Sequence, residues 1–178
     1  MYEAFYGFKE RPFALVPDPS FLYLSKGHST ALTLLRYSIM NRQGFTVVSG
    51  EVGSGKTTLV NCLLDEMKTG VTVGLINFTT RSFGDMAEWI MMAYGLPYKN
   101  KGKVELYEDF VQFMIREYAA GRPVVLIVDE AQNLGIRGLE EIRMLSNVNA
   151  QKEYLLHVIL VGQPELRSLL QTQQLRQL

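Results

Sequence analysis

The sequence predicts an α/β fold in which a parallel sheet is covered on both faces by helices, and three observations carry this prediction. Residues 123–128 form a continuous apolar run, and residues 155–161 form a second run that only His157 interrupts, which is typical of strands buried on both faces of a sheet. These and two further β-rich runs alternate with segments of helical spacing, the order expected of a parallel sheet. A glycine-rich segment, residues 50–55, separates the first strand from the helix that follows it.

The elements follow one another in a regular order. Strands are predicted at residues 45–48, 71–76, 123–128 and 155–161. Helices are predicted at residues 28–42, 57–68, 82–95, 106–120 and 139–147, with a last helix that begins at Pro164. We expect His28 to cap the first helix, Ser82 to be the N-cap of the third, and His157 to lie in the core. The aromatic, proline-rich residues 1–27 are predicted to form an irregular arm.

The composition excludes several classes of protein. With 178 residues, 47% of them hydrophobic, the chain has the size of one globular domain. Its 18 basic and 18 acidic side chains cancel, which excludes a polybasic mode of DNA binding. The single cysteine, Cys62, excludes a disulfide framework and a zinc site built from cysteines. Since neither a signal peptide nor a run of about 20 apolar residues is present, we expect a cytoplasmic protein without a membrane segment.

Residues 50–57 have the pattern of a phosphate-binding loop, the Walker A motif G-x-x-x-x-G-K-[ST]. Glycines allow backbone N–H groups to converge on phosphate oxygens without interference from a Cβ atom. Lys56 would reach the β- and γ-phosphates of ATP, and the Thr57 hydroxyl would ligate Mg²⁺. The residues expected to bind the nucleotide are Gly50, Glu51, Val52, Gly53, Ser54, Gly55, Lys56, Thr57 and Thr58. The alternative, a glycine-rich turn that binds nothing, is disfavoured by the strand before the loop and the helix after it.

Asp129 and Glu130 directly follow an apolar strand and are predicted to be the Walker B acids. Ligands of open α/β sheets bind at the carboxyl ends of the strands. Asp129 would hold Mg²⁺, and Glu130 would orient and activate the attacking water, which favours a hydrolase over a kinase. Taken alone, the two acids could equally mark the N-terminus of a helix. The phosphate loop favours the catalytic interpretation.

Gln163 and two arginines are further candidates. If the strand at 155–161 lies between the first and third strands, Gln163 sits between Lys56 and Asp129, where it can contact the γ-phosphate or the water. It can equally be a polar residue that merely ends a strand. Arg176 or Arg143 could reach the γ-phosphate of a neighbouring subunit as an arginine finger, although most surface arginines have no such role.

Several motifs occur in one order along nearly the whole chain. They are residues 2–8 (YEAFYGF), Pro12-Phe13, Pro17-Asp18-Pro19, the phosphate loop, and residues 129–134 (DEAQNL), 142–147 (IRMLSN) and 161–166 (VGQPEL). Together they resemble the AAA+ ATPases of the general secretion pathway protein A (ExeA) type, a branch near the origin-recognition and transposition-regulator ATPases.

The resemblance implies a P-loop NTPase fold of three α/β/α layers with strand order 5-1-4-3-2. It also implies Mg-ATP hydrolysis in a ring or filament of identical subunits, with a catalytic set of Glu130, Lys56, Gln163 and Arg176. In this set Gln163 takes the place of the polar sensor, and Arg176 falls where the arginine finger is sought. Residues 17–21 would lie near the adenine base. Secretion-type members often continue into a membrane helix, which implies a cytoplasmic domain at the inner membrane.

The chain departs from this family after Arg176. An AAA+ domain has a fifth strand there, followed by a small helical lid, and neither follows before Leu178. We therefore expect residues 28–178 to be an AAA+ core truncated before the lid, with the fifth strand missing. Nucleotide binding should then be better preserved than hydrolysis.

Three functions remain open at this stage. The first is an ATPase that drives assembly or remodelling of a partner complex, such as a type II-like secretion or cell-envelope assembly system. The second is an ATP-dependent DNA-binding regulator of the transposition type, against which the zero net charge counts. The third is a nucleotide switch that does not hydrolyse ATP and acts through contacts with partners.

Overall fold

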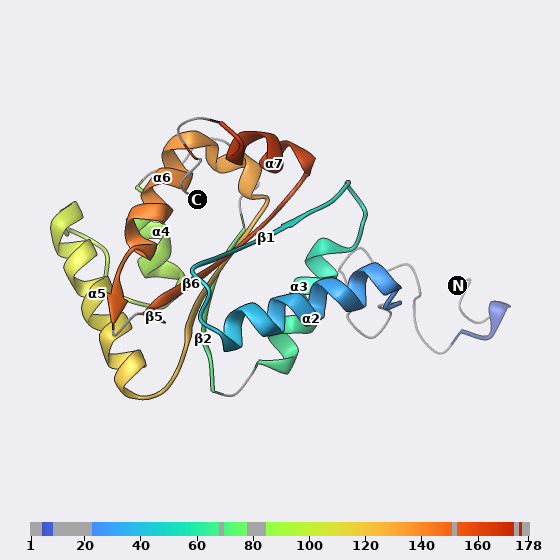
Figure 1. Cartoon of the computed structure of the whole chain (residues 1–178), viewed down its shortest axis with the longest axis horizontal. Coiled ribbons are helices and arrows are strands. Elements are labelled where there is room, and N and C mark those ends of the chain that lie inside the picture. Colours follow the sequence, from blue (N-terminus) through green and yellow to red (C-terminus); the bar gives the residue numbers. More distant parts are fainter. Residues whose placement is uncertain are drawn as a thin grey trace.

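The computed structural model describes residues 5–8, 23–67, 70–77, 85–150, 153–172 and 175. A parallel sheet of four strands crosses the middle of the molecule in the order β1-β6-β3-β2 (Figure 1). Its strands are β1 (Phe45–Ser49), β2 (Thr72–Asn77), β3 (Val124–Asp129) and β6 (Leu156–Gly162). The predicted α/β class is confirmed. So is the position of the last strand between the first and the third, which corresponds to 1-4-3-2 in the expected order.

Helices cover both faces of the sheet and complete the three predicted layers (Figure 1). One face carries α2 (Lys26–Met40) and α3 (Lys56–Glu66). The other carries α4 (Met86–Ala93), α5 (Lys103–Ala119), α6 (Gly135–Ser146) and α7 (Pro164–Leu170). Each layer buries the apolar stripe of its helices against the sheet, so the molecule has two hydrophobic cores.

The two inner strands, β3 and β6, are buried along their whole length, as their apolar runs predicted. Successive side chains of a strand point to opposite faces. Leu126 and Val158 accordingly belong to the core beneath α4, α5 and α6, whereas Ile127 and Ile159 belong to the core beneath α2 and α3. Packing on both faces fixes the ends of these strands, where the predicted site residues lie.

Five helices begin at other residues than predicted: α3 begins one residue early and α5 three residues early, and the other three differ for identifiable reasons. The N-cap of α2 is Ser25, whose hydroxyl accepts the backbone N–H of His28, so His28 is not the cap. Helix α4 begins at Met86 because the Asp85 carboxylate accepts the backbone N–H of Ala87 at 3.1 Å, and the predicted cap Ser82 lies outside the described residues. Helix α6 begins at Gly135, four residues early, because a 3₁₀ turn, η2 (Ala131–Leu134), leads directly into it.

Two further features lie at the margins of the sheet: a hairpin that was not predicted, and the pairing of β1. A short antiparallel hairpin, β4 (Asn149–Ala150) and β5 (Glu153–Tyr154), was not predicted. Among the residues that the structure describes there is no fifth parallel strand, and β1 pairs only with β6. Its residues are accordingly half-buried or exposed, with Val47 42% exposed. In this part of the chain β1 is an edge strand.

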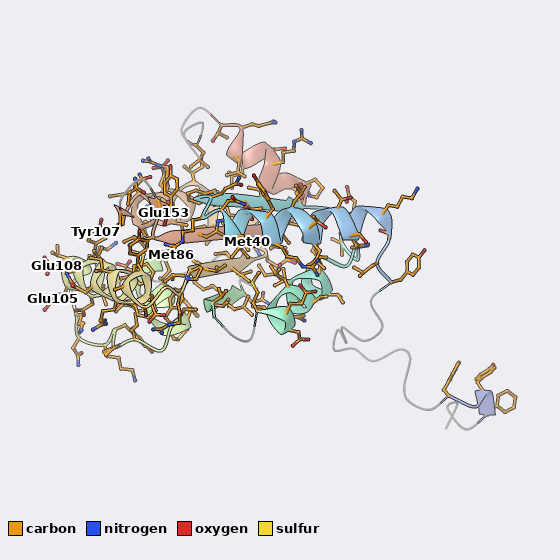
Figure 2. The ribbon with its side chains drawn as sticks, turned by 60° about the horizontal axis from the view of Figure 1, so that its bottom comes forward. Met40, Met86, Glu105, Tyr107, Glu108 and Glu153 are labelled. Carbon is orange, nitrogen blue, oxygen red and sulfur yellow. The ribbon has the colours of Figure 1, made fainter. Side chains whose placement is uncertain are left out.

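Most of the predicted arm, namely residues 1–4 and 9–22, lies outside the described residues. No helix in the described ranges is long and apolar enough to cross a membrane. Figure 2 shows the side chains around the sheet. Glu105, Tyr107 and Glu108 project from α5 at the opposite end of the molecule from the first described residues.

Candidate nucleotide-binding site

The predicted phosphate loop connects the end of β1 to the start of α3, at the carboxyl edge of the sheet. Gly53 and Gly55 have φ angles of 76° and 82°, a left-handed conformation that other residues rarely adopt. A Cβ atom at Gly50 would lie 2.8 Å from Ser54 Oγ, so a side chain there would force the Ser54 hydroxyl to move. Helix α3 begins directly after Gly55, which leaves its first N–H groups available to an anion bound in the loop.

Lys56 is the first residue of α3, and its side chain folds back over the loop. Its Nζ donates hydrogen bonds to the carbonyl oxygens of Gly50 and Glu51, each at 2.8 Å. This arrangement holds the ammonium group at the loop, where phosphate oxygens would replace the two carbonyls with stronger, charge-assisted partners.

A cavity of about 260 Å³ lies over the loop and brings the predicted residues together from three parts of the chain. It is lined by Val52, Gly53, Gly55, Lys56, Thr57, Thr58, Glu130 and Gln163. The structure therefore places Glu130 and Gln163 beside the phosphate loop, as the predicted strand order required. The other predicted nucleotide-binding residues, Gly50, Glu51 and Ser54, belong to the same loop.

Thr57, which lines this cavity, contacts Asp129. The Thr57 hydroxyl donates a hydrogen bond to Asp129 Oδ2 at 2.9 Å, which joins the start of α3 to the end of β3. Asp129 is only 3% exposed, and its other oxygen accepts the backbone N–H of Glu130. Proteins usually hold Mg²⁺ with one or two such oxygen ligands, while phosphate oxygens and water supply the rest. The pair fits the predicted magnesium site.

Glu130 adopts an unusual backbone conformation for a glutamate. Its φ of 53° lies in the left-handed region, which is rarely populated outside glycine and is concentrated at functional sites. The turn sets its carboxylate beside the last sheet strand, where Gln163 Nε2 donates to Glu130 Oε2 at 3.2 Å. The predicted acid and the predicted polar sensor thus touch each other.

Two residues, Gln132 and His28, make contacts at the site that were not predicted. Gln132 donates from Nε2 to Glu130 Oε2 and accepts the backbone N–H of Gln163 at Oε1. His28 donates from Nε2 to the carbonyl oxygen of Ser54 at 2.8 Å, so a residue of α2 supports the phosphate loop. Gln132 lies within the DEAQNL motif, and this motif was the signal in the sequence that could have identified it. A contact between residues 28 and 54 depends on how α2 packs, and no local pattern predicts it.

Of the two arginine candidates, Arg143 lies in the described part of the chain and Arg176 does not. Arg143 lies on α6, where its guanidinium pairs with Glu140 of the same helix at 3.0 Å. Arg176 lies outside the described residues, as do residues 17–21, which the resemblance places near the adenine base. The arginine-finger assignment therefore remains a prediction.

A loop with the Walker A pattern at the end of β1, and an Asp-Glu pair at the end of the inner strand β3 in a β1-β6-β3-β2 sheet, are the arrangement of a P-loop domain. The chain belongs to the AAA domain family, whose model matches residues 39–170. Membership of this family makes the domain a P-loop ATPase.

A curated relative extends the comparison to the whole chain. The general secretion pathway protein A of Aeromonas hydrophila is 38% identical over 179 residues, which is 100% of this chain and 33% of that protein. The chain thus spans about a third of the length of this relative.

Solved structures show the same fold at low sequence identity. The ORC2 protein of Aeropyrum pernix, in ADPNP–ADP complexes, gives a TM-score of 0.61 at 15% identity, over 90% of this chain and 47% of that one. Cdc6p of Pyrobaculum aerophilum gives 0.60 at 20% identity, over 86% of this chain and 45% of that one.

Proposed function

We propose that this domain binds Mg-ATP and hydrolyses it at the carboxyl edge of its sheet. The observation that carries the proposal is the convergence of four predicted residues on one cavity: Lys56, Thr57, Glu130 and Gln163. Asp129 is hydrogen-bonded to one of them, Thr57. The AAA domain match and the nucleotide complexes of the ORC2 relative support ATP as the ligand.

Each residue has a distinct role in this proposal. The loop N–H groups and Lys56 would hold the phosphates, and Thr57 and Asp129 would hold Mg²⁺, which would supply positive charge to offset that of the phosphates. Glu130 accepts a hydrogen bond from the attacking water and takes its proton, while Gln163 contacts the water or the γ-phosphate. Water attacks the γ-phosphorus, and the bond to the bridging oxygen breaks to release ADP and phosphate.

We further propose that the ATP cycle drives assembly or remodelling of a secretion or cell-envelope complex in the cytoplasm. The 38% sequence identity to a general secretion pathway protein A supports a role in secretion. ATP would sit between subunits of a homo-oligomer, with Arg176 as the arginine finger. These statements about partners and assembly rest on the relative, of which this chain covers 33%.

The first experiment is ATP turnover per subunit as a function of protein concentration. A rate that rises cooperatively means that subunits complete each other's sites. Near-zero turnover at all concentrations, with clear ATP binding, would contradict hydrolysis and favour the nucleotide switch. Lys56→Ala is the control. Because its ammonium contacts loop carbonyls rather than the core, this variant should lose ATP binding with little loss of thermal stability.

A filter-retention assay distinguishes the DNA-binding alternative. ATP-dependent retention of duplex DNA that weakens steeply with salt would favour a transposition-type regulator. No retention at low salt would exclude it.

A further inference from the structure

Gln132 holds together two residues of the candidate site without lining the cavity itself. It lies in η2, the turn that follows β3. Its amide group bridges the Glu130 carboxylate and the backbone N–H of Gln163, which begins the connection from β6 to α7. It therefore links the ends of the two inner strands.

The orientation of this amide is set by its partners. The backbone N–H of Gln163 can only donate, so the Gln132 oxygen must face it, at 3.1 Å. The NH₂ group is then left to face Glu130, where a carboxylate can only accept. One backbone donor thus determines that Gln132 presents a donor to the acid.

Gly162 leaves the space that this arrangement needs. A Cβ atom at residue 162 would lie 2.5 Å from Gln132 Oε1, closer than a Cβ approaches any neighbouring atom. Gly162 is the last residue of β6, in register with Ser49 of β1. The close approach of Gln132 therefore depends on a glycine next to the predicted sensor residue.

The donors from Gln132 and Gln163 reach the same oxygen of Glu130, Oε2. Neither glutamine engages the second oxygen, Oε1. Glu130 also has a left-handed backbone, which needs support from its surroundings to persist. Two donors on one oxygen fix the rotation of the carboxylate and leave the other oxygen for a water molecule.

We propose that Gln132 is a positioning residue for ATP hydrolysis, which holds Glu130 by Oε2 so that Oε1 can accept the proton of the attacking water. This inference rests on the proposed function. It assigns Gln132 no contact with ATP, so Gln132 should affect turnover and not nucleotide affinity.

Two substitutions separate this role from a merely structural one. Gln132→Met keeps the volume and removes both hydrogen bonds. Gln132→Glu keeps the oxygen that accepts the Gln163 N–H, and replaces the donor facing Glu130 with an acceptor. If Gln132 only anchors Gln163, the glutamate variant should behave as the parent. If it positions Glu130, both variants should lose ATP turnover.

The experiment measures kcat, KM, affinity for a fluorescent ATP analogue and the thermal midpoint, using the 178-residue chain. We expect kcat to fall about ten- to a hundredfold in both variants, with analogue affinity changed by less than about twofold. Gln112→Glu, on the exposed face of α5, is the control for the added charge. Unchanged kcat in Gln132→Glu would overturn the proposal, as would an equal loss of affinity and turnover.

A second measurement does not depend on hydrolysis. Glu130→Ala should shift the side-chain NH₂ resonances of Gln132 in a ¹⁵N spectrum, because it removes the carboxylate that they bond. Unmoved resonances would overturn the proposed contact even in an active protein. If the resonances shift but the parent shows no turnover, the proposed hydrolysis fails while the Gln132–Glu130 contact stands.

Discussion

At the scale of single residues, the phosphate loop depends on a side chain 26 positions earlier. His28 donates to the Ser54 carbonyl, and the Ser25 hydroxyl lies 2.7 Å from the other ring nitrogen, Nδ1. Because a carbonyl can only accept, Nε2 of His28 must carry a proton. Ser25 therefore orients the ring, and the ring fixes the peptide that joins Ser54 to Gly55.

His28→Ala should weaken ATP binding roughly five- to tenfold, the effect of losing one hydrogen bond that orders the loop. Equilibrium titration with a fluorescent ATP analogue measures this. Thr30→Ala, on the same helix, is the matched control and should bind as the parent does. Equal affinities for His28→Ala and the parent would show that the loop does not need this support.

Asp129→Asn should raise the Mg²⁺ concentration needed for half-maximal nucleotide binding by at least about tenfold. The amide oxygen can accept the Glu130 N–H while its NH₂ group donates to the Thr57 hydroxyl, so the variant keeps both contacts but removes the charge that attracts the cation. Asp109→Asn on α5 removes an equal charge at Lys101, away from the site, and should leave the titration unchanged. Identical Mg²⁺ titrations for Asp129→Asn and the parent would refute the assignment.

The sequence was sufficient to predict the part of the site that local motifs encode. Lys56 and Thr57 follow from a loop pattern whose spacing has a physical meaning, and Asp129 from its place after a buried strand. The left-handed turn at Glu130 and the bridge through Gln132 depend on where β6 ends relative to β3. Such contacts arise from tertiary packing, so a pattern along the chain does not contain them.

At the scale of elements, the packing of α4 on β2 depends on one glycine. Gly74 lies within β2, where a Cβ atom would be 2.7 Å from Cζ of the Tyr94 ring. Tyr94 caps the end of α4, and its ring also packs on Phe110 and Phe113 of α5. The two helices and the edge strand thus meet at a position that has no room for a side chain.

Gly74→Ala should therefore reduce the free energy of unfolding by about 1–3 kcal/mol, the usual cost of overpacking. Urea denaturation measures the change. In a Tyr94→Leu background the same substitution should cost less, because the ring that obstructs the methyl group is gone. Equal costs in both backgrounds would mean that Tyr94 is not the obstacle.

The type and order of the main helices and strands were predictable, while several boundaries were not. Apolar runs buried on both faces identify β3 and β6 without ambiguity. Helix starts depend on which nearby side chain captures a free N–H group, and at α4 Asp85 does so. The hairpin of β4 and β5 has two residues in each strand, too few for an alternating pattern to appear.

At the scale of the whole molecule, His157 ties the sheet to the α2 layer. It lies in β6, is 3% exposed and hydrogen-bonds the Gln43 carbonyl through Nδ1. Its Nε2 lies 3.3 Å from the Ser38 hydroxyl of α2 and 3.4 Å from the Thr46 hydroxyl of β1. Burial lowers the pKa of His157 below its ordinary value, although the bond to Gln43 opposes this.

Stability should consequently fall as the pH decreases below about 6.5, the ordinary histidine pKa. The unfolded chain then binds a proton at residue 157 that the folded chain resists, so acid favours unfolding. Urea midpoints at pH 7.5 and 5.5 measure this for the parent and for His157→Gln. The parent should lose more stability than the variant. An equal loss would assign the effect to other groups.

Within the described residues β1 pairs on one side only, so a strand that paired along its other side would be coupled to nucleotide affinity. β1 runs directly into Gly50, whose N–H donates to the Gly162 carbonyl at 3.2 Å. A strand that paired along the free side would order the residues just before the loop. By thermodynamic reciprocity, a bound nucleotide would then strengthen that pairing by the same factor as the pairing strengthens nucleotide binding. For this domain, strand pairing at that edge of the sheet and nucleotide binding at the phosphate loop would then be thermodynamically coupled.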